Sequence, residues 1–141
     1  MGITRLPRHK LNESISDSLI IDNIVLHSST DTIYFKDINS IFLLHNGAHL
    51  HHFKVKDANE LVGKSDFDYF PKKEAMQKRE DEIKIMETGI ALRDQVEEGL
   101  NANQEQIFFS VSKYPLYDYD GNIIGTWGTS RDVTKMILAE R

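Results

Sequence analysis

A tight-turn signal near the C-terminus limits what this chain can fold into more than any other feature. Asp120 and Gly121 stand between two runs rich in β-branched and aromatic residues, 106–117 and 123–130. An Asp-Gly pair accepts the positive φ angles that two-residue hairpin turns demand. The sequence therefore predicts two long antiparallel strands that are direct neighbours, around which the other elements must pack.

Three more strands are expected before this hairpin. Runs of the same residue types predict strands over 32–36 and 41–44, separated by turn residues, and another over 92–98. Five antiparallel strands with intervening helices indicate an α+β fold. The helices should cover one face of the sheet and leave a concave cavity between the two layers.

Helical patterns occupy the rest of the chain. Pro71 stands where a helix can begin and Gly89 where it can end, which predicts a helix over 72–88. Both signs of charge alternate along it, so Arg79 is expected on a solvated face. The other expected helices are an amphipathic one over 14–27, several short ones within 46–70, and the first turns of another over 135–141.

Composition restricts the partners that we expect. The 141 residues suit one domain and include no cysteine, which excludes disulfides, thiolate zinc sites and cysteine nucleophiles. With 22 acidic against 17 basic side chains the net charge is −5, so no nucleic acid partner is expected. No apolar run approaches the roughly 18 residues of a membrane span, and direct membrane insertion is not expected.

With its elements in this order, the chain resembles a PAS domain of bacterial or archaeal signalling proteins over residues 31–134. The matching pieces are IYFKD at 33–37 with IFLL at 41–44 and Asn46, LVGKSDFDYFP at 61–71, METG at 86–89, KYPLYD at 113–118, DGNIIG at 120–125 and GTSRDVT at 128–134. The resemblance implies a five-stranded sensor domain that binds a small molecule and relays the change to an output domain in the same chain, of the histidine kinase or nucleotide cyclase type.

The alternative is a ligand-free PAS domain used for protein interaction and dimerisation. It is favoured by the aromatic content, since one Trp, five Tyr and seven Phe could fill the interior. An enzyme is not expected, because no base is placed beside a Ser or Thr and no glycine-rich phosphate loop is present. A PAS unit of this kind most often faces the cytoplasm, whether its parent is soluble or membrane-anchored, and the piece is expected to belong to a longer protein.

Strand alternation, combined with the resemblance, predicts which side chains line the cavity. The residue two before the Asp of the Asp-x-Thr ending faces the cavity in flavin-binding relatives, which implies Ser130. The expected lining is Phe35, Leu44, His49, Leu50, Phe53, Met76, Ile83, Phe109, Val111, Lys113, Thr126 and Ser130. Lys113, Ser130, Thr126 and His49 could orient a polar or anionic group of the ligand.

Two further roles are expected at the ends of the domain. The Asp-x-Thr ending, Asp132 and Thr134, is expected to couple the last strand to the outgoing helix over 135–141. Residues 1–30 are expected to form a flanking segment for homodimerisation. The expected dimer interface is Ile15, Leu19 and Ile24 on the amphipathic helix, with Trp127 on the outer sheet face.

Cofactor signals are weak. His45, His49 and His52 would align on one continuous helix, but His45 is expected to end a strand, so neither a metal nor a haem site is predicted. In the better-known haem-binding relatives the ligand lies on the long helix, and 72–88 contains no histidine. Light-sensing flavin relatives use a cysteine, which this chain lacks, so flavin is unsupported as well.

Overall fold

The structure, a computed structural model, describes residues 31–140 except 49, 54 and 102. The expected helix over 14–27 lies outside the described residues, as do Ile15, Leu19, Ile24 and His49. None of the described helices is long and apolar enough to cross a membrane.

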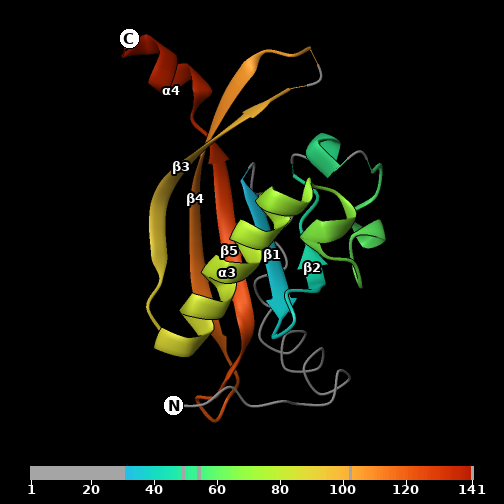
Figure 1. Ribbon diagram of the computed structural model, residues 1–141, viewed down its shortest axis with the longest axis vertical. Coiled ribbons are helices and arrows are strands. Elements are labelled where there is room, and N and C mark those ends of the chain that lie inside the picture. The colour runs from blue at the N-terminus through green and yellow to red at the C-terminus, as the bar shows by residue number, and fades with distance from the viewer. Residues whose placement is uncertain (1–30, 49, 54, 102, 141) are drawn as a thin grey trace.

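One antiparallel sheet of five strands forms the scaffold, in the order β2-β1-β5-β4-β3 (Figure 1). Its strands are β1 (Thr32–Asp37), β2 (Phe42–His45), β3 (Leu92–Leu100), β4 (Gln106–Tyr117) and β5 (Ile123–Asp132). The predicted α+β class and the five predicted strands are confirmed. The first strand of the described chain, β1, pairs with the last one, β5, in the interior of the sheet. This pairing places residues that are far apart in the sequence side by side.

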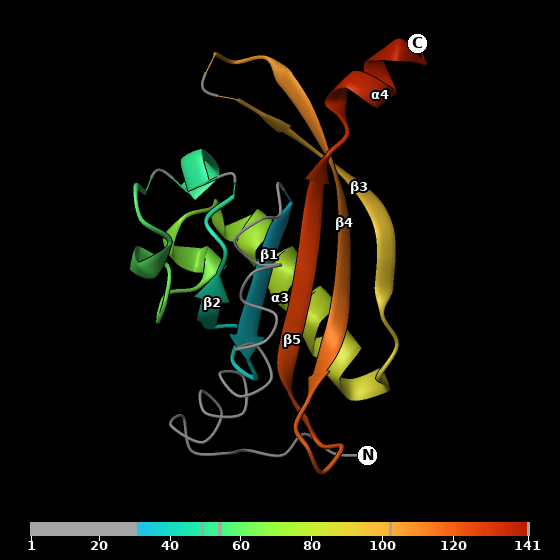
Figure 2. The ribbon, with the colours of Figure 1, turned by 180° about the vertical axis from the view of Figure 1, so that it is seen from behind.

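Helices cover one face of this sheet and its β2 edge (Figures 1 and 2). The long helix α3 (Lys72–Thr88) crosses that face, and the short helices cluster beside β2. These short helices are η1 (Leu50–Phe53), η2 (Ala58–Glu60) and η3 (Asp66–Asp68), and α4 (Thr134–Ala139) follows the last strand. The predicted patch of short helices is confirmed.

The turn between β4 and β5 forms around the predicted Asp-Gly pair, of which Gly121 but not Asp120 has a positive φ. Gly121 has a φ of 83°, in the left-handed region that glycine adopts without strain. The Asp118 carboxylate accepts hydrogen bonds from the backbone N–H groups of Asp120 and Asn122, each at 2.9 Å. The side chain therefore closes the turn, and it fixes the register of the two strands.

Helix α3 begins after Pro71 and ends at Gly89, as predicted, with Gly89 in the left-handed region at a φ of 70°. Its buried residues are Ala75, Glu82, Ile85 and Met86. The expectation that Arg79 is merely solvated is wrong. Its guanidinium donates to the backbone oxygen of Ile38 at 2.9 Å and to the Ser40 hydroxyl at 2.8 Å, so it ties α3 to the turn between β1 and β2.

Candidate functional site

A cavity of about 350 Å³ opens between the sheet and the elements that cover it. Strands β1 and β4 supply two of its walls, and the opposite wall comes from η1, η3 and α3. Five aromatic rings line it: Tyr34, Phe42, Phe53, Phe70 and Phe109. A space bounded by so many flat apolar rings suits a small planar ligand.

Alternation along each strand decides which side chains reach the cavity. On β4 the inward set is Phe109, Val111 and Lys113, which is the set that sequence alternation predicts. On β1 the parity is opposite to the expected one, since Tyr34 and Lys36 line the cavity.

Phe35 therefore does not line the cavity. It lies on the other face of the sheet, where its ring stacks on Trp127 with the ring centroids 6.0 Å apart. Leu44 pairs with Phe35 across β1 and β2 and packs on that same face. The expectation placed the ring of Phe35 inward. It is wrong because the buried carboxylates of Asp66 and Glu82 stabilise Lys36 in the interior, and strand alternation then turns Phe35 to the other face.

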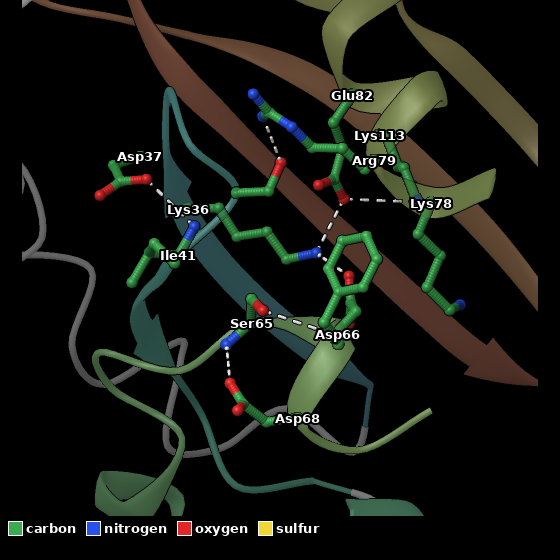
Figure 3. Close-up of polar contacts among 12 residues, drawn as sticks. Lys36, Asp37, Ile41, Ser65, Asp66, Asp68, Lys78, Arg79, Glu82 and Lys113 are labelled. Carbon is green, nitrogen blue, oxygen red and sulfur yellow. Dashed lines mark hydrogen bonds and ion pairs between the residues drawn. The ribbon is translucent and has the colours of Figure 1, made fainter. Parts of the chain in front are cut away.

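The closed end of the cavity holds a buried charge cluster of four residues, Lys36, Asp66, Glu82 and Lys113 (Figure 3). Lys36 Nζ lies 2.6 Å from Asp66 Oδ2 and 2.8 Å from Glu82 Oε2. Burial alone would lower the pKa of Lys36, but the two carboxylates outweigh burial and hold that pKa above its usual range. The ammonium group of Lys36 is thus well paired.

Lys113 is the poorly paired member of the charge cluster. Its side chain is only 4% exposed, and among the described residues its ammonium makes one hydrogen bond, to Glu82 Oε2 at a long 3.5 Å. That oxygen already accepts the shorter bond from Lys36. Burial lowers the pKa of Lys113, and the nearby charge of Lys36 lowers it further, against the opposing pull of Glu82.

Glu82 joins both lysines and is completely buried. Burial alone would raise the pKa of Glu82, but the charges of Lys36 and Lys113 lower it below its usual value. The charge cluster therefore contains an ionised carboxylate shared unequally between two lysines. Lys36 uses two of its three donors in short bonds and Lys113 uses one in a long bond, so Lys113 has more donor capacity left for a ligand.

The open end of the cavity has a different character. Lys78 on α3 lies 3.5 Å from Glu97 on β3, and its Nζ lies 5.0 Å from the centre of the Phe70 ring. Glu74 and Glu98 also line this cavity. Carboxylates thus outnumber the one lysine at this end, which disfavours the entry of an anionic ligand.

The other predicted lining residues are distributed as follows. Phe53 and Ser130 line the cavity, whereas Leu50 and Ile83 are half-buried and do not belong to its wall. Met76 is 43% exposed on the outer side of α3, because the helix buries Ala75 and Glu82 instead. Thr126 is buried but lies beside the cavity without lining it.

Several lining residues were not predicted from the sequence. The most important are Tyr34, Lys36 and Asp66. Asp66 does not cap η3, because Ser65 and Asp68 form the capping box of that helix. One feature of the sequence could have indicated these residues. Lys36 lies in the middle of a strand, and a lysine there needs a carboxylate from elsewhere in the chain if its side chain points inward.

Asp132 and Thr134 lie where the last strand meets α4. The Asp132 carboxylate accepts a hydrogen bond from the Thr134 backbone N–H at 2.9 Å. The Thr134 hydroxyl accepts another from the backbone N–H of Phe108 on β4, also at 2.9 Å. The first residue of α4 is therefore fixed to the same strand that carries Lys113.

His45 lies on a strand and not on a helix, and His49 lies outside the described residues. His45 ends β2, as expected, and its Nδ1 accepts a hydrogen bond from the Gly47 backbone N–H at 3.0 Å. Its ring packs among Tyr34, Phe42 and Phe53. Within the part of the chain that the structure describes, no group of three His, Asp or Glu side chains could hold a metal ion.

Comparison with known proteins identifies relatives of this fold. The PAS fold family matches residues 26–136. The VqmA–ligand–DNA complex from Vibrio cholera superposes with a TM-score of 0.70 at 24% identity, covering 80% of this chain and 50% of VqmA. The phage VqmA–DPO complex gives 0.73 at 18%, covering 92% and 59%. The PAS domain of BvgS from Bordetella pertussis gives 0.62 at 21%, covering 88% and 93%. No curated protein matches the sequence.

These similarities correct one expectation. The acidic composition was taken to exclude a nucleic acid partner, and that exclusion is wrong. A protein with the same fold over 80% of this chain is described as a complex with a ligand and DNA. This chain spans only 50% of that VqmA chain, so the charge of this domain alone does not decide whether the whole protein acts on DNA.

Proposed function

Since this chain belongs to the PAS fold family, we propose that it is a sensory module whose cavity binds a small planar molecule. The observation that carries this proposal is the position of Lys113. Its ammonium is buried on the cavity wall with one long hydrogen bond, at 3.5 Å. A buried donor without a good acceptor is costly, and a ligand with an acceptor atom at this point would remove that cost.

The size and walls of the cavity support the same class of ligand. A volume of about 350 Å³ falls at the lower end of the range for small-molecule pockets. Aromatic rings favour a flat ligand, and the carboxylates at the open end favour a neutral or cationic one. The phage VqmA is described as a complex with DPO, which supports ligand binding by a domain of this fold.

A ligand acts on a sensor only through a difference in affinity between two states. Strand β4 carries Lys113 in the cavity and holds Thr134 of α4 through Phe108, so a shift of β4 would change how α4 is held. We assign the relay to this path, from the cavity to an output domain in the same chain. A histidine kinase, a nucleotide cyclase or a DNA-binding domain as in VqmA are the candidate outputs.

Any catalytic activity of the whole protein then belongs to the output domain and not to this domain. Homodimerisation through residues 1–30 and the Trp127 face stays a prediction, as does a cytoplasmic location. The open cavity favours ligand sensing over the alternative, a ligand-free PAS domain that serves only for protein interaction and dimerisation.

Native mass spectrometry of the protein as purified tests the proposal. We expect a bound small molecule that appears again in an extract of the denatured protein, and we expect the Lys113→Met variant to lose it. Lys84→Met, on the exposed side of α3, is the matched control and should retain it. A folded wild-type protein that carries no small molecule and takes up none from a cell extract would refute the proposal.

A further inference from the structure

The amine of Lys113 combines three properties that are rarely found together. It is buried, it lines a cavity large enough for a small molecule, and a second lysine shares the one carboxylate that pairs with it among the described residues. Most lysines lack the first two, because their long side chains extend into water and stay protonated there. The amine of Lys113 therefore has a reactivity that hydrogen bonding alone does not use.

A lysine is a nucleophile only in its neutral form. Burial disfavours the charged form, and so does a cation close by. Both act on Lys113, since Lys36 bonds to the same Glu82 oxygen at 2.8 Å and neutralises much of the charge that would otherwise stabilise the Lys113 ammonium. Glu82 stays ionised, because the two lysines lower its pKa, so the proton that the amine releases passes to solvent.

From this arrangement we infer that Lys113 is a site of reversible covalent capture for small aldehydes, aromatic ones above all. The inference deepens the proposed function, since it requires the cavity to admit a ligand. The five aromatic rings of the wall would hold the ring of an aromatic aldehyde, with its carbonyl carbon at the closed end. The open end, with its carboxylates, admits such neutral molecules.

The reaction needs no oxidant or reductant. The lone pair of Lys113 Nζ attacks the carbonyl carbon, and one of the two protons of the neutral amine moves to the carbonyl oxygen to give a carbinolamine. The nitrogen then forms a double bond to that carbon and loses its second proton, with which the hydroxyl group leaves as water, and an imine remains. Amine and aldehyde thus give imine and water, and water reverses the step.

Reductive trapping tests the inference on the full chain. The protein is incubated with benzaldehyde and sodium cyanoborohydride at pH 7, and the modified lysines are located by peptide mass spectrometry. The pKa of Lys113 is lowered by burial and the cavity holds the aldehyde beside its amine, so we expect Lys113 to be labelled severalfold more than exposed Lys84. The labelling of Lys113 should also level off at a lower pH than that of Lys84.

Benzyl alcohol, which has the same ring but cannot form an imine, separates this inference from the proposed function. Its binding is followed through the ring NMR signals of the cavity, in wild type and in Lys113→Arg. If benzyl alcohol binds and Lys113 is labelled no more than Lys84, the imine is refuted and ligand sensing stands. If neither compound enters the folded protein, both are refuted. Selective labelling of Lys113 that benzyl alcohol suppresses confirms the inference.

Discussion

Replacing Lys36 by methionine should cost the fold far more than the same replacement at Lys113. Lys36 pairs with Asp66 at 2.6 Å and with Glu82 at 2.8 Å, and these carboxylate side chains are 8% and 0% exposed. Removing one partner of a buried ion pair costs about 3–5 kcal/mol, because the remaining charge is left without compensation. We expect Lys36→Met to lower the free energy of unfolding by about this amount, a large part of the roughly 5–15 kcal/mol of a typical domain.

The replacement at Lys113 removes much less. Its one hydrogen bond is long, at 3.5 Å, and Glu82 keeps its better partner Lys36. Such a bond contributes about 1 kcal/mol or less, and the loss is offset because the variant no longer buries an amine that is poorly paired. Methionine is similar in length and fills the same space. We therefore expect Lys113→Met to stay within about 1 kcal/mol of wild type.

Urea unfolding at pH 7 measures both variants against wild type, with an unchanged m-value as the sign that the unfolding reaction is the same. A second series at lower pH checks the cause. The pKa of Glu82 is lowered in the folded protein, so its charge contributes stability above the usual glutamate pKa of 4.5 and that contribution is lost as the pH falls further. The deficit of Lys36→Met should shrink in the same range. Equal losses for the two variants at pH 7 would refute the distinction between the two lysines.

Three other variants test the contacts that hold the strands and helices of this domain together. A Cβ at Gly125 would lie 2.0 Å from the backbone oxygen of Lys36, so Gly125→Ala should separate β1 from β5 and cost about 3 kcal/mol or more in urea unfolding. Thr134→Val loses the hydrogen bond from the Phe108 N–H, and hydrogen exchange in α4 should become faster while the sheet stays protected. Arg79→Met removes two hydrogen bonds to the turn between β1 and β2, and a loss of about 1.5–3 kcal/mol is expected by thermal unfolding.

The elements of this fold could be predicted because short-range chemistry determines them. The turn at Gly121 and the helix between Pro71 and Gly89 depend on the φ angles of single residues. The residue types glycine and proline indicate those angles in the sequence. The parity of β4 was also predictable, since Phe109 and Val111 agree on which face is apolar.

The parity of β1 was not predictable in the same way. Tyr34 and Phe35 are both aromatic, and the usual rule then sends the neighbouring Lys36 outward with Tyr34. The decision depends on Asp66 and Glu82, which lie 30 and 46 residues further along the chain. No local pattern contains that information. The same reason explains Met76, since a sequence that mixes both charges along α3 does not reveal that Glu82 is the buried residue and Met76 the exposed one.

Two of these failures coincide in space. Lys36 and Glu82, which take inward positions where apolar residues were expected, meet Lys113, which the sequence had already placed on the cavity wall, at one end of one cavity. Buried charges seldom add stability over apolar residues of the same volume, so stability alone gives no reason to keep all three. Lys36 and Glu82 compensate each other and can be understood as a structural pair. The charge of Lys113 is not compensated in this way within the fold, and a molecule that enters the cavity would supply the missing partner.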